Sequence, residues 1–144
     1  MKPHTWHRKI LPAAAVIILG IQFIPISRNN PPVVKELDWD SAGTRKFAQR
    51  ACFDCHSNQV RWPWYSRVAP VSWLISSDVG NAREMLNFSA ITDEDGFNFV
   101  AKQINKGVMP PKRYLALHAE ARLTDAEKTE FLSGLKKSFE LSGL

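Results

Sequence analysis

Apolar and polar residues follow one another along this chain in patterns that predict helices separated by proline-containing segments. The longest apolar run covers residues 10–26, ILPAAAVIILGIQFIPI, and holds no charged residue and one amide, Gln22. The basic stretch MKPHTWHRK precedes it. A run of 17 residues lies at the lower limit of the roughly 17–25 residues that cross a bilayer. The pattern therefore predicts a single N-terminal transmembrane helix.

A cleaved signal peptide and a buried core helix are the alternatives to a retained anchor. Cleavage sites follow small residues, whereas the apolar run ends in FIPI at residues 23–26. The absence of a polar face in the run argues against a core helix. Lys2, Arg8 and Lys9 are expected to stay in the cytoplasm. These features predict a single-pass inner-membrane protein whose remaining chain lies in the periplasm, on the outer side of the cytoplasmic membrane.

The rest of the chain is expected to form one domain after a short linker. Residues 1–28 are assigned to the anchor or signal sequence, and residues 29–38 to an extended linker, because the adjacent prolines Pro31 and Pro32 oppose a helix. Residues 39–144 are long enough for one domain with a hydrophobic core of its own.

Four segments of this domain have apolar residues at helical spacing, and no alternating strand pattern competes with them. Ser41 or Asp40 is expected to cap the first helix. Thr92 with Asp95 and Thr124 with Glu127 have the spacing of capping boxes, and Gly107 is expected to end the third helix. The fold class is therefore predicted to be all-α. The four segments are residues 41–55, 71–86, 92–106 and 124–139.

The charge distribution does not favour nucleic acid as a partner. The formal net charge is +5, but residues 1–30 hold four basic residues and no acidic one. Residues 31–144 then carry 15 basic and 14 acidic residues, scattered along the chain. A nearly neutral domain lacks the basic stripe that binds phosphates. No nucleic-acid partner is expected.

The chemistry-bearing motif is ACFDCHSN, residues 51–58, in which Cys52, Cys55 and His56 form the pattern C-x-x-C-H. These are the only two cysteines in the chain. The pattern is typical of c-type haem attachment. Two thiols three positions apart on a helical turn each add to one haem vinyl group, and the following histidine supplies an axial nitrogen to iron. The motif predicts one covalent haem c.

Three other interpretations fit two nearby cysteines. A structural disulfide would close a very small loop and gives His56 no role. A thioredoxin-like redox motif is expected within a βαβ pattern, which this sequence lacks. A zinc site needs a fourth ligand, for which His118 is the candidate in the domain.

Aromatic residues cluster after the motif, in RWPWYSRVAPVSW. Two prolines break this segment, so its aromatic side chains do not share one face of a regular helix. They suit either an ordinary aromatic core or the wall around a flat macrocycle. Trp62, Trp64 and Tyr65 are predicted to contact the haem, with Arg61 as a further donor to a propionate. A carbonyl of this proline-rich loop is a candidate acceptor for the second ring nitrogen of His56.

The sixth iron ligand is predicted to be Met109, in GVMPPKRY. Pro110 and Pro111 stiffen this loop, so a thioether is held there at little entropic cost. Met85 belongs to a helical apolar stripe and is expected in the core. His118 remains an alternative ligand.

The blocks QFIPISRNNPP, CFDCHSN, WPWYSRVAPVSW, AREMLNFS and GVMPPKRYLALHAEARLTDAEK occur in an order that resembles the small bacterial haem-binding-domain family, which is related to monohaem c-type cytochromes. The resemblance covers most of residues 21–130. It implies an exported, mostly helical, cytochrome c-like domain around one covalent haem. It further implies thioether links at Cys52 and Cys55, His56 as proximal ligand, and, through the M-P-x-x-x-Y loop, Met109 as distal ligand with Tyr114 in its loop.

These features predict a membrane-anchored, one-electron carrier rather than an enzyme. Its expected partners are membrane or periplasmic redox proteins and the cytochrome c maturation machinery, with the membrane itself contacted through residues 10–26. The alternative is a haem-based redox or gas-sensing module with a displaceable sixth ligand. Peroxidase chemistry is not expected, because c-type peroxidases usually employ a second haem and the chain has one C-x-x-C-H motif.

Overall fold

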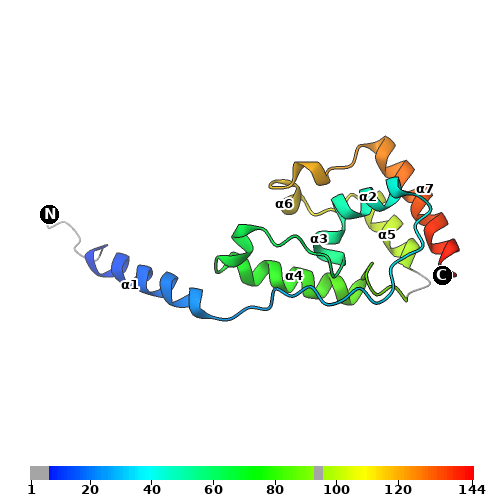
Figure 1. The fold of residues 1–144 in the computed structure, drawn as a ribbon. Helices are drawn as coiled ribbons and strands as arrows, with labels where there is room; N and C mark the ends of the chain where they lie inside the picture. The colour runs from blue at the N-terminus through cyan, green and yellow to red at the C-terminus, as the bar shows by residue number, and fades with distance from the viewer. Residues whose placement is uncertain (1–6, 93–95) are drawn as a thin grey trace. The chain divides into compact units, whose positions relative to one another are not determined.

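The computed structural model describes residues 7–92 and 96–144, and in these ranges the chain is helical, which confirms the all-α prediction (Figure 1). One isolated parallel bridge, between Lys35 and Ala90, is the β interaction found in the described ranges. The helices, with the short 3₁₀ helices labelled η, are α1 (His7–Gly20), η1 (Ile21–Phe23), α2 (Ala42–Ala51), α3 (Phe53–His56), η2 (Trp64–Arg67), α4 (Val71–Met85), α5 (Gly96–Asn105), α6 (Lys112–Leu115), η3 (Ala119–Ala121) and α7 (Asp125–Leu141).

The chain divides into two units, and α4 contributes to both of them. The first unit combines the N-terminal part up to Arg28 with Trp62–Asp78. The second unit combines Asn29–Arg61 with Val79–Leu144 and contains α2, α3, α5, α6 and α7.

The predicted N-terminal transmembrane helix is wrong. Among the described residues no helix is both long and apolar enough to cross a membrane. The apolar run is divided: α1 ends at Gly20, η1 follows, and Ile24 is extended before Pro25. The 14 residues of α1 rise about 21 Å, short of the roughly 30 Å of a bilayer core. The predicted single-pass inner-membrane localisation rested on this helix and is therefore wrong as well. Lys2, which was used to orient the span, lies outside the described residues.

Within the first unit, the amide of Gln22 binds the backbone before α4. Its Nε2 donates to the Ala69 carbonyl at 3.2 Å, and its Oε1 accepts from the Ala69 amide at 2.9 Å. Arg28 donates to the carbonyl of Ser66 at 3.3 Å. The one amide of the apolar run thus satisfies both backbone groups of Ala69 and also donates to the carbonyl of Ile18 at 2.9 Å.

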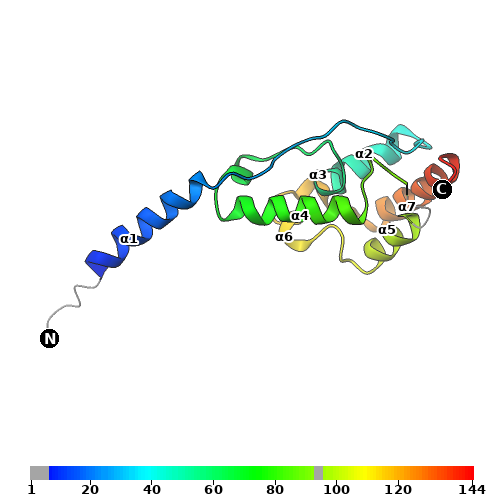
Figure 2. The same cartoon turned by 90° about the horizontal axis from the view of Figure 1, so that it is seen from below.

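The core of the second unit lies where α7 packs on α2 and α5, an arrangement visible in Figure 1 and again in Figure 2. The predicted capping box at Thr124 and Glu127 is confirmed, since both of its hydrogen bonds form at the start of α7. The residues buried in this core are Leu37, Ala48, Phe53, Leu86, Phe88, Ile91, Val100, Ile104, Leu123, Phe131, Leu135 and Phe139.

The other predicted helix ends are confirmed in part. Ser41 caps α2 by accepting from the amide of Thr44 at 3.1 Å. Gly107, with φ of 65°, follows α5 and adopts the left-handed conformation typical of helix ends. The expected capping role of Asp95 lies outside the described residues, and α5 begins after it, at Gly96.

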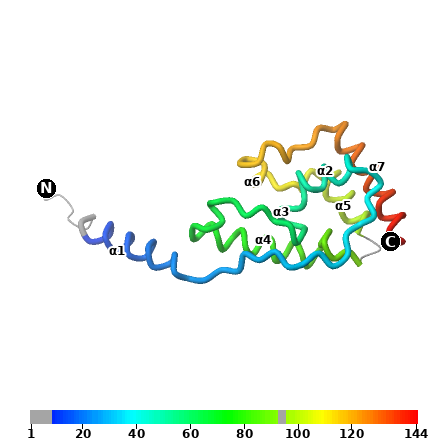
Figure 3. Tube along the Cα trace, in the orientation of Figure 1, coloured from blue at the N-terminus to red at the C-terminus, as the bar shows by residue number. Residues whose placement is uncertain are grey.

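Residues 29–40 form an extended strap bound along the second unit. Asn30 exchanges hydrogen bonds with the backbone of Val60, at 2.9 and 3.2 Å. Lys35 donates through its amide to the Ser89 carbonyl and accepts from the amide of Ile91, so the strap pairs with the segment after α4. The same path appears in the tube of Figure 3. The strap therefore joins the residues that follow the C-x-x-C-H segment to the segment that follows α4.

Candidate functional site

The C-x-x-C-H motif forms a tight helical turn at the end of α2. The amide of Cys52 completes α2 by donating to Ala48, and the backbone then departs from helical geometry at Cys52, with φ of −126°. α3 follows at once, and the amide of His56 donates to the carbonyl of Cys52 at 2.9 Å. Phe53 is buried between the two cysteines and stacks on Phe88, with ring centroids 5.7 Å apart. The buried ring anchors the motif to the core.

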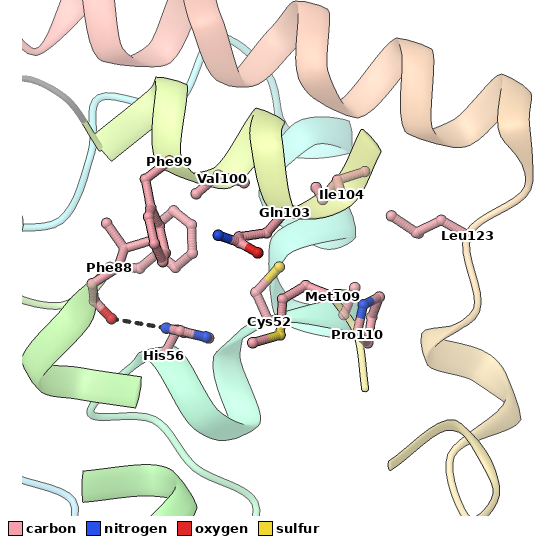
Figure 4. Close-up of a pocket in the computed structure, with 12 residues that line it drawn as sticks. Cys52, His56, Phe88, Phe99, Val100, Gln103, Ile104, Met109, Pro110 and Leu123 are labelled. Atoms are coloured by element: carbon pink, nitrogen blue, oxygen red, sulfur yellow. Dashed lines mark hydrogen bonds between the residues drawn. The ribbon is translucent and has the colours of Figure 1, made fainter. Parts of the chain in front are cut away.

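Cys52, His56 and Met109 line one pocket in the second unit (Figure 4). The pocket is walled almost entirely by apolar groups, with the amide of Gln103 as the other polar side chain. Its volume is about 40 Å³. The remaining lining residues are Ala51, Leu86, Phe88, Phe99, Val100, Ile104, Pro110 and Leu123.

The imidazole of His56 is held in one orientation and one tautomer. Its Nδ1 lies 3.0 Å from the carbonyl oxygen of Leu86, and a carbonyl only accepts, so Nδ1 carries the proton (Figure 4). Burial lowers the pKa of His56 below its usual value of 6.5, which favours the neutral ring. Nε2 therefore keeps a lone pair for a metal. The acceptor follows α4, so the prediction that it lies in the proline-rich loop was wrong.

A second backbone bond fixes the same two segments together. The amide of Phe88 donates to the carbonyl of His56 at 2.8 Å. Ser57 reinforces the turn by donating to the Phe53 carbonyl, and its own carbonyl accepts from Arg83 at 2.9 Å. Arg83 also reaches the backbone of Asn29, at 3.1 Å, and so ties the strap to the motif.

Met109 lies in a loop that the end of α5 organises. The amides of Val108 and Met109 both donate to the carbonyl of Gln103, at 3.1 and 3.4 Å. Pro110 and Pro111 then lead into α6, which Pro111 caps with its carbonyl. The loop places the thioether on the wall of the pocket that His56 also lines.

A polar cluster connects the Met109 loop to the C-x-x-C-H turn. The hydroxyl of Tyr114, on α6, donates to Oδ2 of Asp54 at 2.8 Å. Asp54 stands between the two cysteines and also accepts from the amide, Nε and Nη2 of Arg61, at 3.1, 3.2 and 3.0 Å. Burial, followed by the carboxylate of Asp54, raises the pKa of Tyr114 well above its usual value. The phenol is therefore a neutral donor at physiological pH.

The two cysteines are thiols rather than a disulfide. Burial, followed by the proximity of Cys55, raises the pKa of Cys52 from 9.0 to about 12. Thioredoxin-like cysteines have lowered pKa values, because the thiolate is the reactive form. The environment of Cys52 therefore does not match that of a redox-active C-x-x-C pair. In the described ranges no group of three or more His, Cys, Asp or Glu side chains is arranged to hold a metal ion.

The predicted aromatic contacts belong to the first unit. Trp64 is 78% exposed and meets Tyr65 edge-on, with centroids 5.8 Å apart. The indole nitrogen of Trp62 is buried and has no hydrogen-bond partner. That these three residues contact a haem stays a prediction.

The two alternative ligands lie in different surroundings from Met109. Met85 is 57% exposed at the end of α4, so its expected place in the core was wrong. The ring of His118 stacks on Tyr114 at 4.2 Å, and its Nδ1 lies 3.3 Å from Glu120. Neither side chain is among those lining the pocket of His56 and Met109.

Sequence reasoning missed several residues of this site. Asp54 and Gln103 occupy ordinary helical positions, and nothing in their spacing marks them. Phe88 and Phe99 are single aromatics outside the conspicuous tryptophan cluster. The carbonyl of Leu86 has no side-chain signal, although its position directly after a helix, where carbonyls lack intrahelical partners, is a usable clue.

Comparison with known families identifies the cofactor that this chain binds. A family model described as a haem-binding domain matches residues 16–137 of the chain. The chain belongs to this haem-binding family. The suspected resemblance is confirmed, and the protein is a haem-binding protein. No curated protein and no solved structure matches the chain.

The residues of the pocket fit a haem in their chemistry. A neutral imidazole with a free Nε2 and a thioether are both common iron ligands, and apolar walls suit the macrocycle. Pockets for ligands of this size enclose about 300–1,000 Å³, far more than the 40 Å³ found here. A haem placed in this pocket would need the walls to separate, and the loop that carries Met109 is a wall without regular secondary structure.

Proposed function

We propose that this protein is a monohaem c-type electron carrier. In this proposal the thiols of Cys52 and Cys55 form the covalent attachment, His56 is the proximal iron ligand and Met109 the distal one. The observation that carries the proposal is that His56, Met109 and Cys52 line one apolar pocket although they come from separate segments of the chain.

The arrangement of His56 supports its assigned role. The bond from Nδ1 to the Leu86 carbonyl fixes the tautomer that offers Nε2, and it increases the basicity of the ring as a ligand. Burial keeps the ring neutral, so no proton competes for the lone pair at physiological pH.

The role of the two cysteines is supported by their spacing and their state. Both sulfur atoms are thiols on one helical turn, and neither is used in a disulfide. A half-buried, protonated Cys52 is less prone to oxidation before its attachment, because the thiolate is the form that oxidises readily. The proposal accordingly includes the cytochrome c maturation machinery as the partner that performs the attachment.

Electron transfer suits a haem with both axial positions filled, because a six-coordinate iron exchanges one electron with little rearrangement. When bound, the haem supplies a metal that exchanges one electron. The protein keeps its two ligands in place, separates the site from water through apolar walls, and lets an electron pass to a partner. We propose redox proteins as the partners and transfer, rather than catalysis, as the activity.

The experiment is to express the full chain with and without a c-type maturation system and to denature the purified protein in acidic organic solvent. Haem that stays with the polypeptide supports covalent attachment. A double variant, Cys52→Ala with Cys55→Ala, should release its haem in the same solvent. Haem that is released from the wild-type protein would contradict the c-type assignment.

A second measurement separates electron transfer from gas or redox sensing. The reduced wild-type protein is mixed with carbon monoxide, and its visible spectrum is followed. A six-coordinate carrier should change little, because Met109 occupies the sixth position. Rapid and complete carbon monoxide binding would instead favour the sensing module with a displaceable ligand.

A further inference from the structure

A side-chain hydrogen bond between Tyr114 and Asp54 connects the segment after Met109 to the C-x-x-C-H turn. The phenol donates to Oδ2 at 2.8 Å. Sixty residues separate the two in sequence, so the bond is a long-range tie rather than a local turn contact. Four residues lie between Met109 and Tyr114, and two of these four are prolines.

We propose that Tyr114 and Asp54 form a clamp that controls how readily Met109 leaves the iron. This inference rests on the proposed function, because it assigns a positioning role to residues beside the proposed distal ligand. Tyr114 is a positioning residue: it acts through the loop and not on the iron itself.

Asp54 is built to serve as the fixed end of the clamp. It lies between Cys52 and Cys55, so its backbone moves with the attachment turn. Its side chain is 10% exposed, and its carboxylate accepts four hydrogen bonds, three from Arg61 and one from Tyr114. Hydrogen bonds to an ionised acceptor are about twice as strong as neutral ones.

Tyr114 links the fixed position of Asp54 to the loop that carries Met109. Its ring stacks on His118 at 4.2 Å with an interplanar angle of 12°. The amides of Leu117 and His118 both donate to its carbonyl, each at 3.1 Å. Its own amide donates to the carbonyl of Pro111 at 2.9 Å. Tyr114 thus holds the segment from Pro111 to His118 together through its backbone and its ring, and its hydroxyl binds this segment to Asp54.

Removing the hydroxyl should loosen this loop while leaving the rest of the site intact. In Tyr114→Phe, the ring remains to stack on His118, and Asp54 keeps its three bonds from Arg61. Loss of a hydrogen bond to a charged group corresponds to about a tenfold change in an equilibrium. Met109 should therefore leave the reduced iron about tenfold more often.

The test is the rate at which the reduced holoprotein binds carbon monoxide at saturating gas, where departure of the methionine limits the reaction. Tyr114→Phe should raise this rate about tenfold, and Asp54→Asn should raise it as well. The double variant should not exceed the larger single effect, because both changes break the same bond. Rates that are unchanged in Tyr114→Phe, or that multiply in the double variant, would overturn the clamp.

A matched control removes a hydroxyl elsewhere in the same unit. The hydroxyl of Ser142 accepts from the amide of Asp38 at 2.8 Å and donates to Ser138 at 2.8 Å. Ser142→Ala should cost similar stability and leave the carbon monoxide rate unchanged. An equal rise in this variant would mean that general destabilisation, and not the clamp, opens the site.

Amide hydrogen exchange of the haem-free protein tests the clamp even if the proposed function fails. Residues 112–118 should exchange faster in Tyr114→Phe, whereas α7 should exchange as in the wild type. If covalent haem is absent but residues 112–118 exchange faster in Tyr114→Phe, the electron-carrier function is refuted, whereas the role of the Tyr114–Asp54 hydrogen bond in holding the loop is supported. Unchanged exchange of residues 112–118 would overturn the clamp in either case.

Discussion

The Nδ1 of His56 lies 3.0 Å from the carbonyl oxygen of Leu86, and this bond determines which nitrogen of the ring faces the pocket. The two residues are joined a second time through the backbone, because the amide of Phe88 donates to the His56 carbonyl at 2.8 Å. The end of α4 therefore orients the imidazole before any ligand is bound.

We predict that the haem-free protein holds His56 as the neutral tautomer with its proton on Nδ1. The bond to Leu86 stabilises that tautomer, and burial lowers the pKa of the ring. Nitrogen-15 correlation spectra of the imidazole at pH 7 distinguish the two ring nitrogens. A predominant Nε2 proton, or a charged ring at that pH, would contradict the prediction. His118, which is stacked on Tyr114, provides a second ring for comparison in the same spectra.

Met109→Ala should convert the reduced holoprotein from a form that resists carbon monoxide to one that binds it readily. The pocket contains both His56 and Met109, and the smaller side chain supplies no sixth ligand. The oxidised variant should also lose the weak far-red absorption of methionine-ligated iron, and its reduction potential should fall.

His118→Ala is the matched control, because His118 is the other candidate ligand and lies outside the pocket lining. This variant should keep the far-red band. Loss of the band in His118→Ala, with its retention in Met109→Ala, would reverse the ligand assignment.

Much of the second unit was predictable because its signals are local. Ser41, Thr124 and Glu127 cap their helices as their spacing indicates, and Gly107 ends α5 with a positive φ. The C-x-x-C-H motif carries its chemistry within five residues. The outcome shows that helix caps are reliable predictions when all of their partners are close in sequence, whereas the covalent attachment that the motif indicates stays a prediction.

The failures came from features that depend on tertiary contacts. The apolar run at residues 10–26 was treated as one helix, but the backbone leaves the α-helix after Gly20, and Gln22 binds Ala69, 47 residues away. The acceptor for His56 is a backbone carbonyl, which no side-chain pattern reveals. Met85 is exposed although it occupies a position of the apolar stripe. Hydrophobic periodicity identifies a face but does not say what covers it.

Cys52 should react slowly with alkylating agents in the folded, haem-free protein. A pKa of about 12, against a usual value of 9.0, leaves about a thousandfold less thiolate near pH 8, and burial restricts access further. The measurement is the rate of iodoacetamide labelling at each cysteine, followed by mass spectrometry. Unfolding in denaturant should restore the ordinary rate. Rapid labelling of Cys52 in the folded protein would contradict its raised pKa.

Two glycine substitutions should change stability in opposite directions. In Gly134→Ala the new methyl group would meet the side chains of Thr44 and Asp40, so α7 and α2 would be forced apart at a cost of about 1–3 kcal/mol. In Gly80→Ala, within α4, nothing lies near the added methyl group, and better helix propensity should stabilise the protein by about 0.5–1 kcal/mol. Urea unfolding of the two variants measures both effects. Destabilisation of equal size at both positions would show that close packing at Gly134 is not the cause.

Tyr114 should make the haem-free protein less stable as the pH rises above 10. The folded-state pKa of Tyr114 is raised, chiefly by burial, above the usual value of 10.0. Below that value the phenol is protonated in both the folded and the unfolded chain, so its contribution to stability is complete. At higher pH the unfolded chain releases the proton first, which favours unfolding until the folded-state pKa is reached.

The chain has two tyrosines, so in Tyr65→Phe the only phenol is that of Tyr114. The absorbance of this variant at alkaline pH should show tyrosine ionisation only together with unfolding. In Tyr114→Phe the stability should fall less steeply over the same range, because that proton is absent. Ionisation of Tyr114 near pH 10 in the folded protein would show that its hydroxyl is not held against Asp54.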